Sequence, residues 1–328
     1  MTLHRRRFLR DISGGLMAGA LFSSEGPAAA ASRTRWKGAA GTLLEVQGKD
    51  AARMLAAALE ALPGFEAAVR GRRIAIKPNA TGFQPFPVTT DPELIRLLVS
   101  ELKRRGAFDI TVCDAPSYAG VAASRVFSKL GYFELGRQER IRVVCSDPVR
   151  ASQHVRVSRP EWRRNRFVLT NRVVQEADFV INLAVPKRHH AAGFSCALKN
   201  NFGCTADTFR TLAHLHEQDG FFAEALVEFA DAVRPDLTIV DARKMLTRSG
   251  PGFTPGNRRS GTAPAWCFRA TWLPWTATVR GSWRRPTAPS RWTGVLPRNS
   301  AMLGLSVWET PTESEPTTWS RIFDQGQE

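Results

Sequence analysis

The stretch Phe179–Cys204 concentrates side chains that could carry chemistry. An apolar run is followed by two cations and two imidazoles, and then by a lysine and two asparagines. These residues are Lys187, Arg188, His189, His190, Lys199, Asn200 and Asn201. Cationic side chains suit a carboxylate or phosphate, and a histidine can act as a base, an acid or a metal ligand. We therefore expect a functional site in this stretch.

A less specific interpretation stays open for each half of the stretch. Residues 187–190 could form a solvated basic loop in which one histidine caps a helix. Lys199 could satisfy the last carbonyl groups of a short helix that Gly203 stops. Two histidines four residues apart, as in a helical metal site, are absent, because His214 and His216 are two residues apart.

The elements that must position these residues alternate between strands and helices. Apolar runs predict strands at 73–76, 109–113, 141–145, 168–170, 179–183 and 237–240. Helices are expected at 49–62, 91–105, 121–130, 172–176 and 220–233. Residues 146–166 are interpreted as an irregular basic insertion. The alternation predicts an α/β fold with a mainly parallel sheet and helices on both faces.

Polar residues follow four of the predicted strands, at or just past their carboxyl ends. They are Lys77, Asn79, Asp114, Asn182 and Asp241. Ligands bind at this edge of open α/β sheets. Each residue taken alone could instead cap a helix or a turn.

The expected ligand is a small anion or an anionic cofactor, whose identity and reaction are left open. Catalytic roles are expected for His189, His190, Lys199 and Asp114. Ligand-binding roles are expected for Lys77, Asn79, Asn182, Lys187, Asn200 and Asp241. The lysines would hold negative charge and the asparagines would orient the ligand. One histidine would transfer protons or bind a metal, and the aspartates would supply carboxylates.

The first 31 residues have the three parts of an export signal. A basic segment, His4–Arg10, precedes a short apolar run and the small residues Ala28–Ala31. The apolar run has about 11 residues, too few for a membrane span of roughly 20. The paired arginines before Phe8 indicate the twin-arginine route. We expect export in the folded state by the twin-arginine machinery, and a mature periplasmic chain that starts near Ser32 and has no stable membrane span.

The formal net charge of +16 does not by itself indicate nucleic-acid binding. Much of the excess lies in residues 242–308, which contain no Asp or Glu. No nucleic-acid recognition motif is present, so such a partner is not expected. The five cysteines form no CxxC pair, which gives no support to an iron–sulfur cluster. Cys196 and Cys204 could pair in an oxidising compartment or stay as buried thiols.

Several of these features together resemble the domain of unknown function 362 family. The segments that carry the likeness are the basic leader, Lys77-Pro78-Asn79, Asp114, Ile181-Asn182 with Lys187 and His189-His190, Ala197–Gly203, and Val240-Asp241 before Gly250-Pro251. The resemblance covers about residues 70–256. It implies an α/β domain, sometimes found in iron–sulfur proteins, whose activity is not established.

Residues 258–296 differ from the rest of the chain. They hold five of the nine tryptophans and no Lys, Asp or Glu. Moving the reading frame back by one nucleotide would permit a strand followed by Asp-x-Val-Ala-x-Asp across Ala265–Arg280, similar to the closing motif of the same family. We hypothesise two compensating frame errors, with the original frame resuming at about Arg298.

The domain organisation that follows has four parts. They are a signal peptide at 1–31, an α/β domain at 32–257, a frame-shifted segment at 258–296 and a C-terminal helix and tail at 297–328. The leading hypothesis is an exported, enzyme-type protein that binds a small anion or cofactor and that could be redox-related. The alternatives are a non-catalytic periplasmic binding protein and a non-functional frameshifted copy.

Overall fold

A computed structural model describes Trp36 and residues 44–116, 122–146, 150–189, 192–216 and 220–246, with the backbone of two short strands at 260–261 and 266–268. These residues all belong to one compact unit, Met1–Pro274. A second unit, Trp275–Glu328, lies outside the described residues, as do the proposed signal peptide and most of the segment 258–296.

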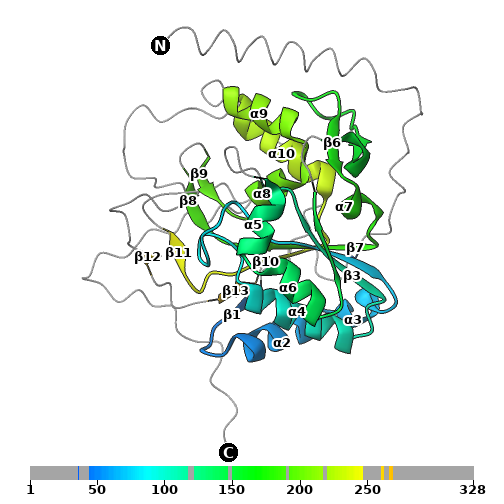
Figure 1. Ribbon diagram of the computed structural model, residues 1–328, viewed down its shortest axis with the longest axis vertical. Helices are drawn as coiled ribbons and strands as arrows, with labels where there is room; N and C mark the ends of the chain where they lie inside the picture. Colours follow the sequence, from blue (N-terminus) through cyan, green and yellow to red (C-terminus); the bar gives the residue numbers. More distant parts are fainter. Residues whose placement is uncertain are drawn as a thin grey trace, which may run out of the picture. The chain divides into compact units, whose positions relative to one another are not determined.

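The central sheet has seven strands in the order β1-β13-β10-β7-β2-β3-β4 (Figure 1). Five neighbours, from β10 to β4, run parallel, and β13 is antiparallel to both β1 and β10. The strands are β1 (Leu44–Val46), β2 (Arg73–Lys77), β3 (Asp109–Asp114), β4 (Arg142–Cys145), β7 (Phe179–Ala184), β10 (Leu237–Val240) and β13 (Trp266–Phe268). The predicted α/β class with a mainly parallel sheet is confirmed.

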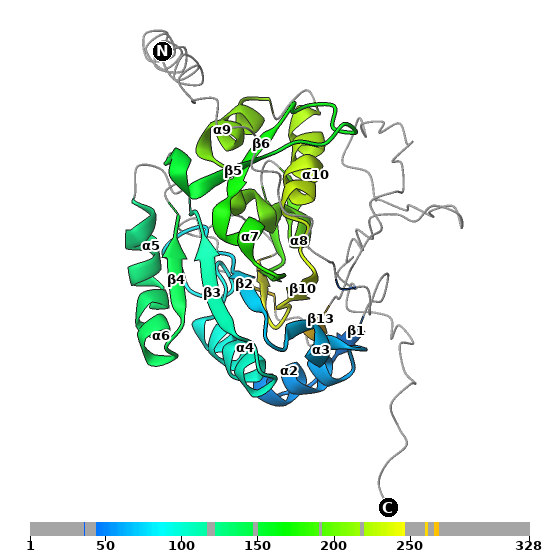
Figure 2. The same ribbon diagram turned by 90° about the vertical axis from the view of Figure 1, so that its right-hand side faces the viewer.

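Helices cover both faces of this sheet (Figure 2). One face packs against α2 (Ala51–Glu60), α3 (Phe65–Val69), α4 (Pro92–Arg104), α5 (Ala123–Lys129) and α6 (Tyr132–Gln138). The other face lies against α7 (Arg172–Glu176) and α10 (Phe221–Val233). Among the described residues, no helix has the length and apolar character that a membrane crossing requires.

Alternation of side chains along the strands gives the main sheet one apolar core on each face. Ile74 and Ile76 of β2 face the larger helical layer, whereas Ala75 between them faces the other side. Neighbouring strands repeat this pattern, as with Val112 and Cys113 of β3. Cys204 of the site-bearing stretch packs in this second core together with Ala75 and Cys113.

Three smaller groups of elements lie beyond the carboxyl ends of the parallel strands. A four-stranded sheet contains β8 (Lys187–His189), β9 (Gly193–Ser195), β11 (Met245–Leu246) and β12 (Ser260–Gly261). A hairpin contains β5 (His154–Val157) and β6 (Val168–Asn171). The helices are α8 (Ala197–Asn200) and α9 (Asp207–Leu215), with short 3-10 turns η2 (Ala151–Gln153) and η3 (Asn201–Cys204).

One expectation about an irregular segment is wrong, and one alternative that the sequence left open does not hold. The basic insertion 146–166 contains β5, which pairs along its length with β6. The segment after Pro186 forms β8, in which Lys187 and His189 are buried and Arg188 is exposed, so it is not a solvated loop. In contrast, the helix expected at 91–105 is present as α4, and the Asp91 side chain caps it by accepting a hydrogen bond from Glu93 N at 3.0 Å.

Candidate functional site at the carboxyl edge of the sheet

The candidate site is built where β2, β3, β7 and β10 end. In the parallel register Lys77 of β2 lies beside Asn182 of β7, and Asn182 lies beside Thr238 of β10. Lys77, Asp114 and Asn182 are all buried. The sheet order therefore brings together polar residues that are far apart in the sequence.

Lys77 and Asp114 form a buried ion pair at the centre of this edge. Lys77 Nζ lies 2.9 Å from Asp114 Oδ1, and the two side chains are 1% and 4% exposed. Lys77 Nζ also donates to the carbonyl oxygen of Pro78 at 2.6 Å. Asp114 accepts from the backbone N–H groups of Ala80 at 3.0 Å and Ala115 at 2.8 Å. The pair is thus compensated from within the protein, as burial of two charges requires.

Gly203 lies directly against this ion pair. A Cβ atom at this position would lie 2.2 Å from Asp114 Oδ1 and 3.1 Å from Lys77 Nζ. The Gly203 carbonyl accepts from Ala115 N at 3.1 Å, so the backbone of η3 packs on the end of β3. The glycine is needed here for close approach. It does not stop the helix as the sequence indicated, because α8 ends at Asn200 and Gly203 lies within η3.

Asn200 and Asn182 extend the network toward β7. Asn200 Nδ2 donates to Asn182 Oδ1 at 2.7 Å, while Asn200 Oδ1 lies 3.5 Å from Lys77 Nζ. Asn182 Nδ2 donates to the carbonyl oxygen of Ala197 at 2.8 Å and thereby holds the start of α8. The two amides therefore fix α8 to the ends of β2 and β7.

Lys187 occupies a second, fully buried position beside this network. Lys187 Nζ donates to Asn79 Oδ1 at 3.0 Å and to the carbonyl oxygen of Val88. Burial lowers its pKa to about 7, and the neighbouring positive charges of Lys199 and Lys77 act in the same direction. At neutral pH this amine is therefore divided between its charged and neutral forms.

Lys199 and His189 lie around these buried groups. Lys199 Nζ sits 3.6 Å from the centre of the Phe202 ring, and its side chain is partly exposed. His189 is 5% exposed, and its Nδ1 accepts from Ala192 N at 3.2 Å. His190 lies outside the described residues.

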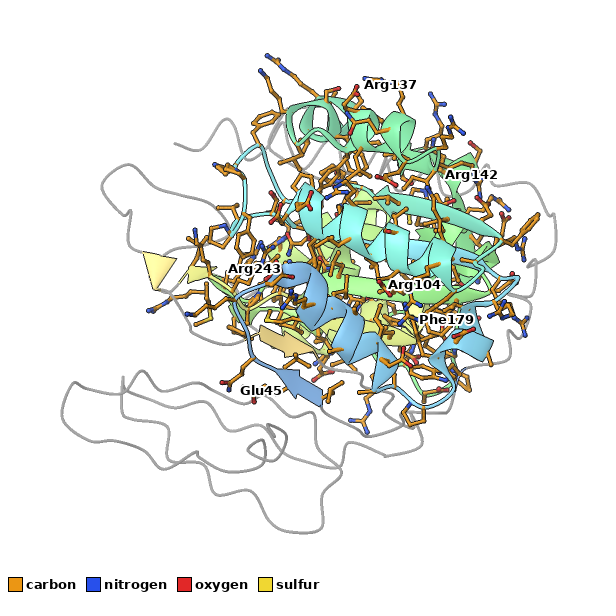
Figure 3. All side chains as sticks on the ribbon, turned by 90° about the horizontal axis from the view of Figure 1, so that it is seen from below. Glu45, Arg104, Arg137, Arg142, Phe179 and Arg243 are labelled. Atoms are coloured by element: carbon orange, nitrogen blue, oxygen red, sulfur yellow. The ribbon has the colours of Figure 1, made fainter. Side chains whose placement is uncertain are left out.

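Asp241 is at the end of β10 and is held by Arg243. Arg243 Nη2 lies 2.8 Å from Asp241 Oδ2 and 2.7 Å from Asp91 Oδ2, so it links β10 to the start of α4. Burial raises the pKa of Asp241, against the opposite effect of Arg243. Figure 3 shows Arg243 at one end of the sheet and Phe179 and Arg142 at the other end. Phe179 is the first residue of β7, and Arg142 is the first residue of β4.

Two arginines near the site were not found from the sequence. Arg243 precedes Lys244 in a basic run, and nothing in that run indicates two carboxylate partners. Arg210 is 3% exposed on α9 and donates to the carbonyl oxygen of Ala115 at 2.7 Å, while its Nε has no acceptor. Its position in an amphipathic helix gives no signal of this contact.

The positions of the cysteines and of the metal-ligating side chains limit the chemistry of the site. No disulfide joins Cys196 to Cys204, so the pairing that the sequence left open is not formed in the described residues. Burial raises the pKa of Cys204 to about 12. Within the described ranges, no group of three His, Cys, Asp or Glu side chains is placed to hold a metal ion.

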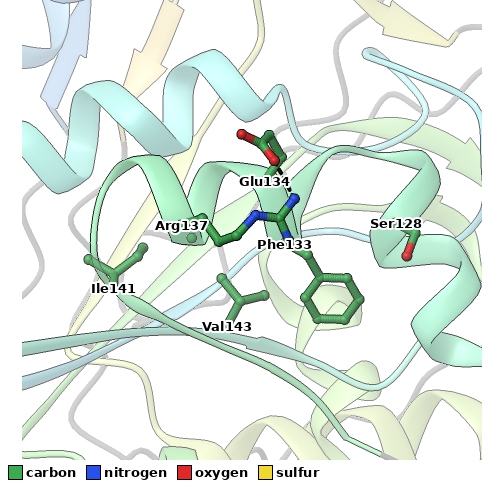
Figure 4. Close-up of a pocket in the computed structure, with 7 residues that line it drawn as sticks. Ser128, Phe133, Glu134, Arg137, Ile141 and Val143 are labelled. Atoms are coloured by element: carbon green, nitrogen blue, oxygen red, sulfur yellow. Dashed lines mark hydrogen bonds and ion pairs between the residues drawn. The ribbon is translucent and has the colours of Figure 1, made fainter.

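A separate hollow of about 540 Å³ lies on the surface at α5, α6 and β4 (Figure 4). Its lining includes Phe133, Ile141 and Val143, with the ion pair of Glu134 and Arg137 beside them. None of the predicted site residues lines it. It is therefore distinct from the carboxyl edge of the sheet.

Two known proteins are similar to this chain. The thylakoid-associated protein sll1697 of Synechocystis sp. is 28% identical over 235 residues, which is 66% of this chain and 67% of that protein. The lactate racemase apoprotein from Thermoanaerobacterium thermosaccharolyticum is 14% identical with a TM-score of 0.46. That alignment covers 69% of this chain but only 54% of the racemase chain.

The family described as domain of unknown function DUF362 matches residues 74–263. The match includes every predicted site residue, from Lys77 to Asp241. It extends over more than half of the chain, and this protein therefore belongs to the DUF362 family.

Proposed function

We propose that this protein is of the enzyme type and binds a small anionic ligand or cofactor at the carboxyl edge of its main sheet. One observation carries the proposal: the amino group of Lys187 is buried against Asn79 and the carbonyl oxygen of Val88. Burial, and after it the charges of Lys199 and Lys77, lower the pKa of this amine. Asp114 is ion-paired with Lys77. The remaining positive potential in a region shielded from water favours an anion.

The three lysines would have different roles. Lys77 is paired with Asp114 and would shape the site more than it contacts the ligand. Lys199 is partly exposed and would meet the ligand first. Lys187, with a pKa of about 7, would take up a proton when a negative charge arrives beside it. The proton that Lys187 takes up on binding would then be available for acid–base chemistry on the ligand.

The amides and the remaining ionisable groups would orient the ligand. Asn182 and Asn200 are already held by each other, so their positions are set before any ligand binds. Asn79 accepts a hydrogen bond from Lys187 Nζ on its Oδ1, so a change in the protonation of Lys187 would change this hydrogen bond. His189 would be the imidazole that transfers protons. Asp241 would be a carboxylate at the border of the site.

Calorimetric titration of the full chain tests this proposal, with inorganic phosphate, acetate and succinate as probes. At pH 8, two buffers of different ionisation enthalpy would reveal proton uptake on binding. We expect uptake of up to about one proton for wild type, none for Lys187→Met, and weaker binding for Lys199→Met. The exposed Lys129→Met is the matched control. Binding that is unchanged in the Lys187 and Lys199 variants would refute the assignment.

A non-catalytic binding protein is the second candidate. The observation that favours it is that Lys77, Asp114, Asn182 and Asn200 satisfy one another, as in a preformed binding frame. The variant His189→Gln separates the two candidates in the same titrations. Unchanged affinity and unchanged proton uptake would favour the binding protein, whereas altered proton uptake with retained affinity would favour the enzyme.

Export by the twin-arginine route is also part of the proposal. The supporting observation is the basic segment with Arg5, Arg6 and Arg7 before Phe8. Replacing all three arginines with lysine keeps the charge and should leave the precursor in the cytoplasm. N-terminal sequencing of the wild-type protein from the periplasm should find a start near Ser32. Equal export of the lysine variant would exclude this route.

The frame hypothesis for residues 258–296 is a proposal about the gene. Resequencing on both strands should find two compensating errors, with the shifted reading across Ala265–Arg280. An unchanged sequence together with stable, soluble protein would refute it.

A further inference from the structure

The β5–β6 hairpin carries a concentration of arginines that the proposed site does not use. Between Arg150 and Arg172 the chain contains seven arginines and one acidic residue, Glu161. Arg156, Arg163 and Arg166 are exposed. Within the described residues, no ion pair joins these three side chains to a carboxylate, so the hairpin has an outward-facing positive charge.

A buried carboxylate fixes the loop that presents these arginines. Glu228 of α10 is 6% exposed and accepts hydrogen bonds from the backbone N–H groups of Arg163, Arg164 and Asn165, at 2.7 to 2.8 Å. Trp162 Nε1 donates to Asp231 Oδ2 at 2.5 Å, one turn further along α10. Because the backbone of this loop faces α10, the side chains of Arg163 and Arg166 point toward solvent.

Exposed leucines lie on the helix that packs against this basic hairpin. Helix α9 adjoins the hairpin in both views (Figures 1 and 2), and Phe209 packs edge-on against Phe167 with ring centres 5.6 Å apart. Leu212, one turn after Phe209, is 42% exposed, and Leu215 is 52% exposed. Half of the large apolar side chains exposed in the described part of the chain are therefore on this one helix.

We propose that this surface, formed by Arg156, Arg163, Arg166, Leu212 and Leu215, binds the anionic phospholipids of a membrane surface. Guanidinium groups donate pairs of hydrogen bonds to phosphate oxygens, and neighbouring leucines enter the boundary between headgroups and acyl chains. A single-stranded nucleic acid fits less well. Its bases need free aromatic faces, whereas Phe167 is covered by Arg156 and Phe209.

Vesicle flotation of the full chain tests this inference. Vesicles contain phosphatidylcholine alone or with about one third phosphatidylglycerol. A basic residue near an anionic surface contributes about fivefold to binding, so Arg163→Gln/Arg166→Gln should lower partition to the anionic vesicles about thirtyfold. The matched control, Arg104→Gln/Arg137→Gln, removes the same charge from exposed positions on α4 and α6 and should change partition less than threefold. All variants keep the same N-terminal segment, so the difference reports the hairpin.

The leucines give an independent measurement. Because about 1 M salt screens charge interactions strongly, binding that survives it reports apolar insertion. Leu212→Ser/Leu215→Ser should lose this residual binding, while Phe108→Ser, with an exposed side chain on another part of the fold, should keep it. Three results would each overturn the proposal. They are equal binding to neutral and anionic vesicles, an equal loss in the arginine control, and tighter arginine-dependent binding to a duplex DNA.

Discussion

The titration of Lys187 should be visible in the stability of the protein. The folded state lowers the pKa of this amine from 10.5 to about 7. Above pH 7 the folded protein therefore holds Lys187 mostly neutral, while the unfolded chain keeps it protonated up to about pH 10.5. Over this window the unfolded state binds more protons, so the free energy of unfolding increases with pH.

The size of the effect follows from the same two pKa values. The complete penalty for protonated Lys187 is roughly 5 kcal/mol, present in full below about pH 7. Between pH 6.5 and 8.5 about 2 kcal/mol of that penalty disappears. Replacing Lys187 with methionine keeps the length of the side chain and removes the titrating group. The lost hydrogen bonds to Asn79 and Val88 add a cost that does not depend on pH.

Urea unfolding followed by tryptophan fluorescence at several pH values measures this directly. The difference in free energy of unfolding between wild type and Lys187→Met should rise by about 2 kcal/mol from pH 6.5 to 8.5. The control Lys129→Met changes an exposed lysine and should follow wild type at every pH. A wild-type minus Lys187→Met difference that stays constant within about 0.5 kcal/mol would refute the reasoning that Lys187 is buried and neutral.

Three further predictions concern the stability of the surrounding elements, each measured by urea unfolding. Asp114→Asn leaves Lys77 buried without its charge partner and should lower stability by about 3–5 kcal/mol, whereas adding Lys77→Met should restore part of it; a further loss in the double variant would contradict the pairing. Gly203→Ala places a methyl group on Asp114 and should cost about 1–3 kcal/mol, and no loss would show that the η3 backbone is not confined there. Glu228→Gln should cost about 1–3 kcal/mol, against less than about 0.5 kcal/mol for the exposed Glu224→Gln, and equal effects would exclude the anchoring role of Glu228.

The positions of polar residues at strand ends could be predicted because each parallel strand is a short apolar run. Lys77 and Asp114 come where such a run stops, Asn182 interrupts another run near its end, and the structure places all three at one buried edge. Their partners could not be predicted, because pairing depends on strand order. β7 lies between β10 and β2, and this places Asn182 beside Lys77 although about a hundred residues separate them.

The chemistry around β8 was harder to predict because its pattern is unusual. Alternation of buried and exposed residues normally identifies a strand by apolar side chains at every second position. In β8 the buried positions are Lys187 and His189, and the exposed one is Arg188. All three are polar, so the hydropathy of the segment indicates a loop. The pairing of β8 with β9 and β11, and the contacts of Lys187 Nζ with Asn79 and Val88, place this lysine in the buried position that changes its pKa.

The ion pair of Lys77 and Asp114 changes how the other charges of the site can act. Because Asp114 already neutralises Lys77, the positive charge available to a bound anion comes mainly from Lys199 and from the protonated fraction of Lys187. That fraction is small above pH 7, so the unliganded site can hold its lysines together with little mutual repulsion. An arriving anion would offset the cost of protonating Lys187, and affinity should therefore decline as the pH rises above the pKa of that amine.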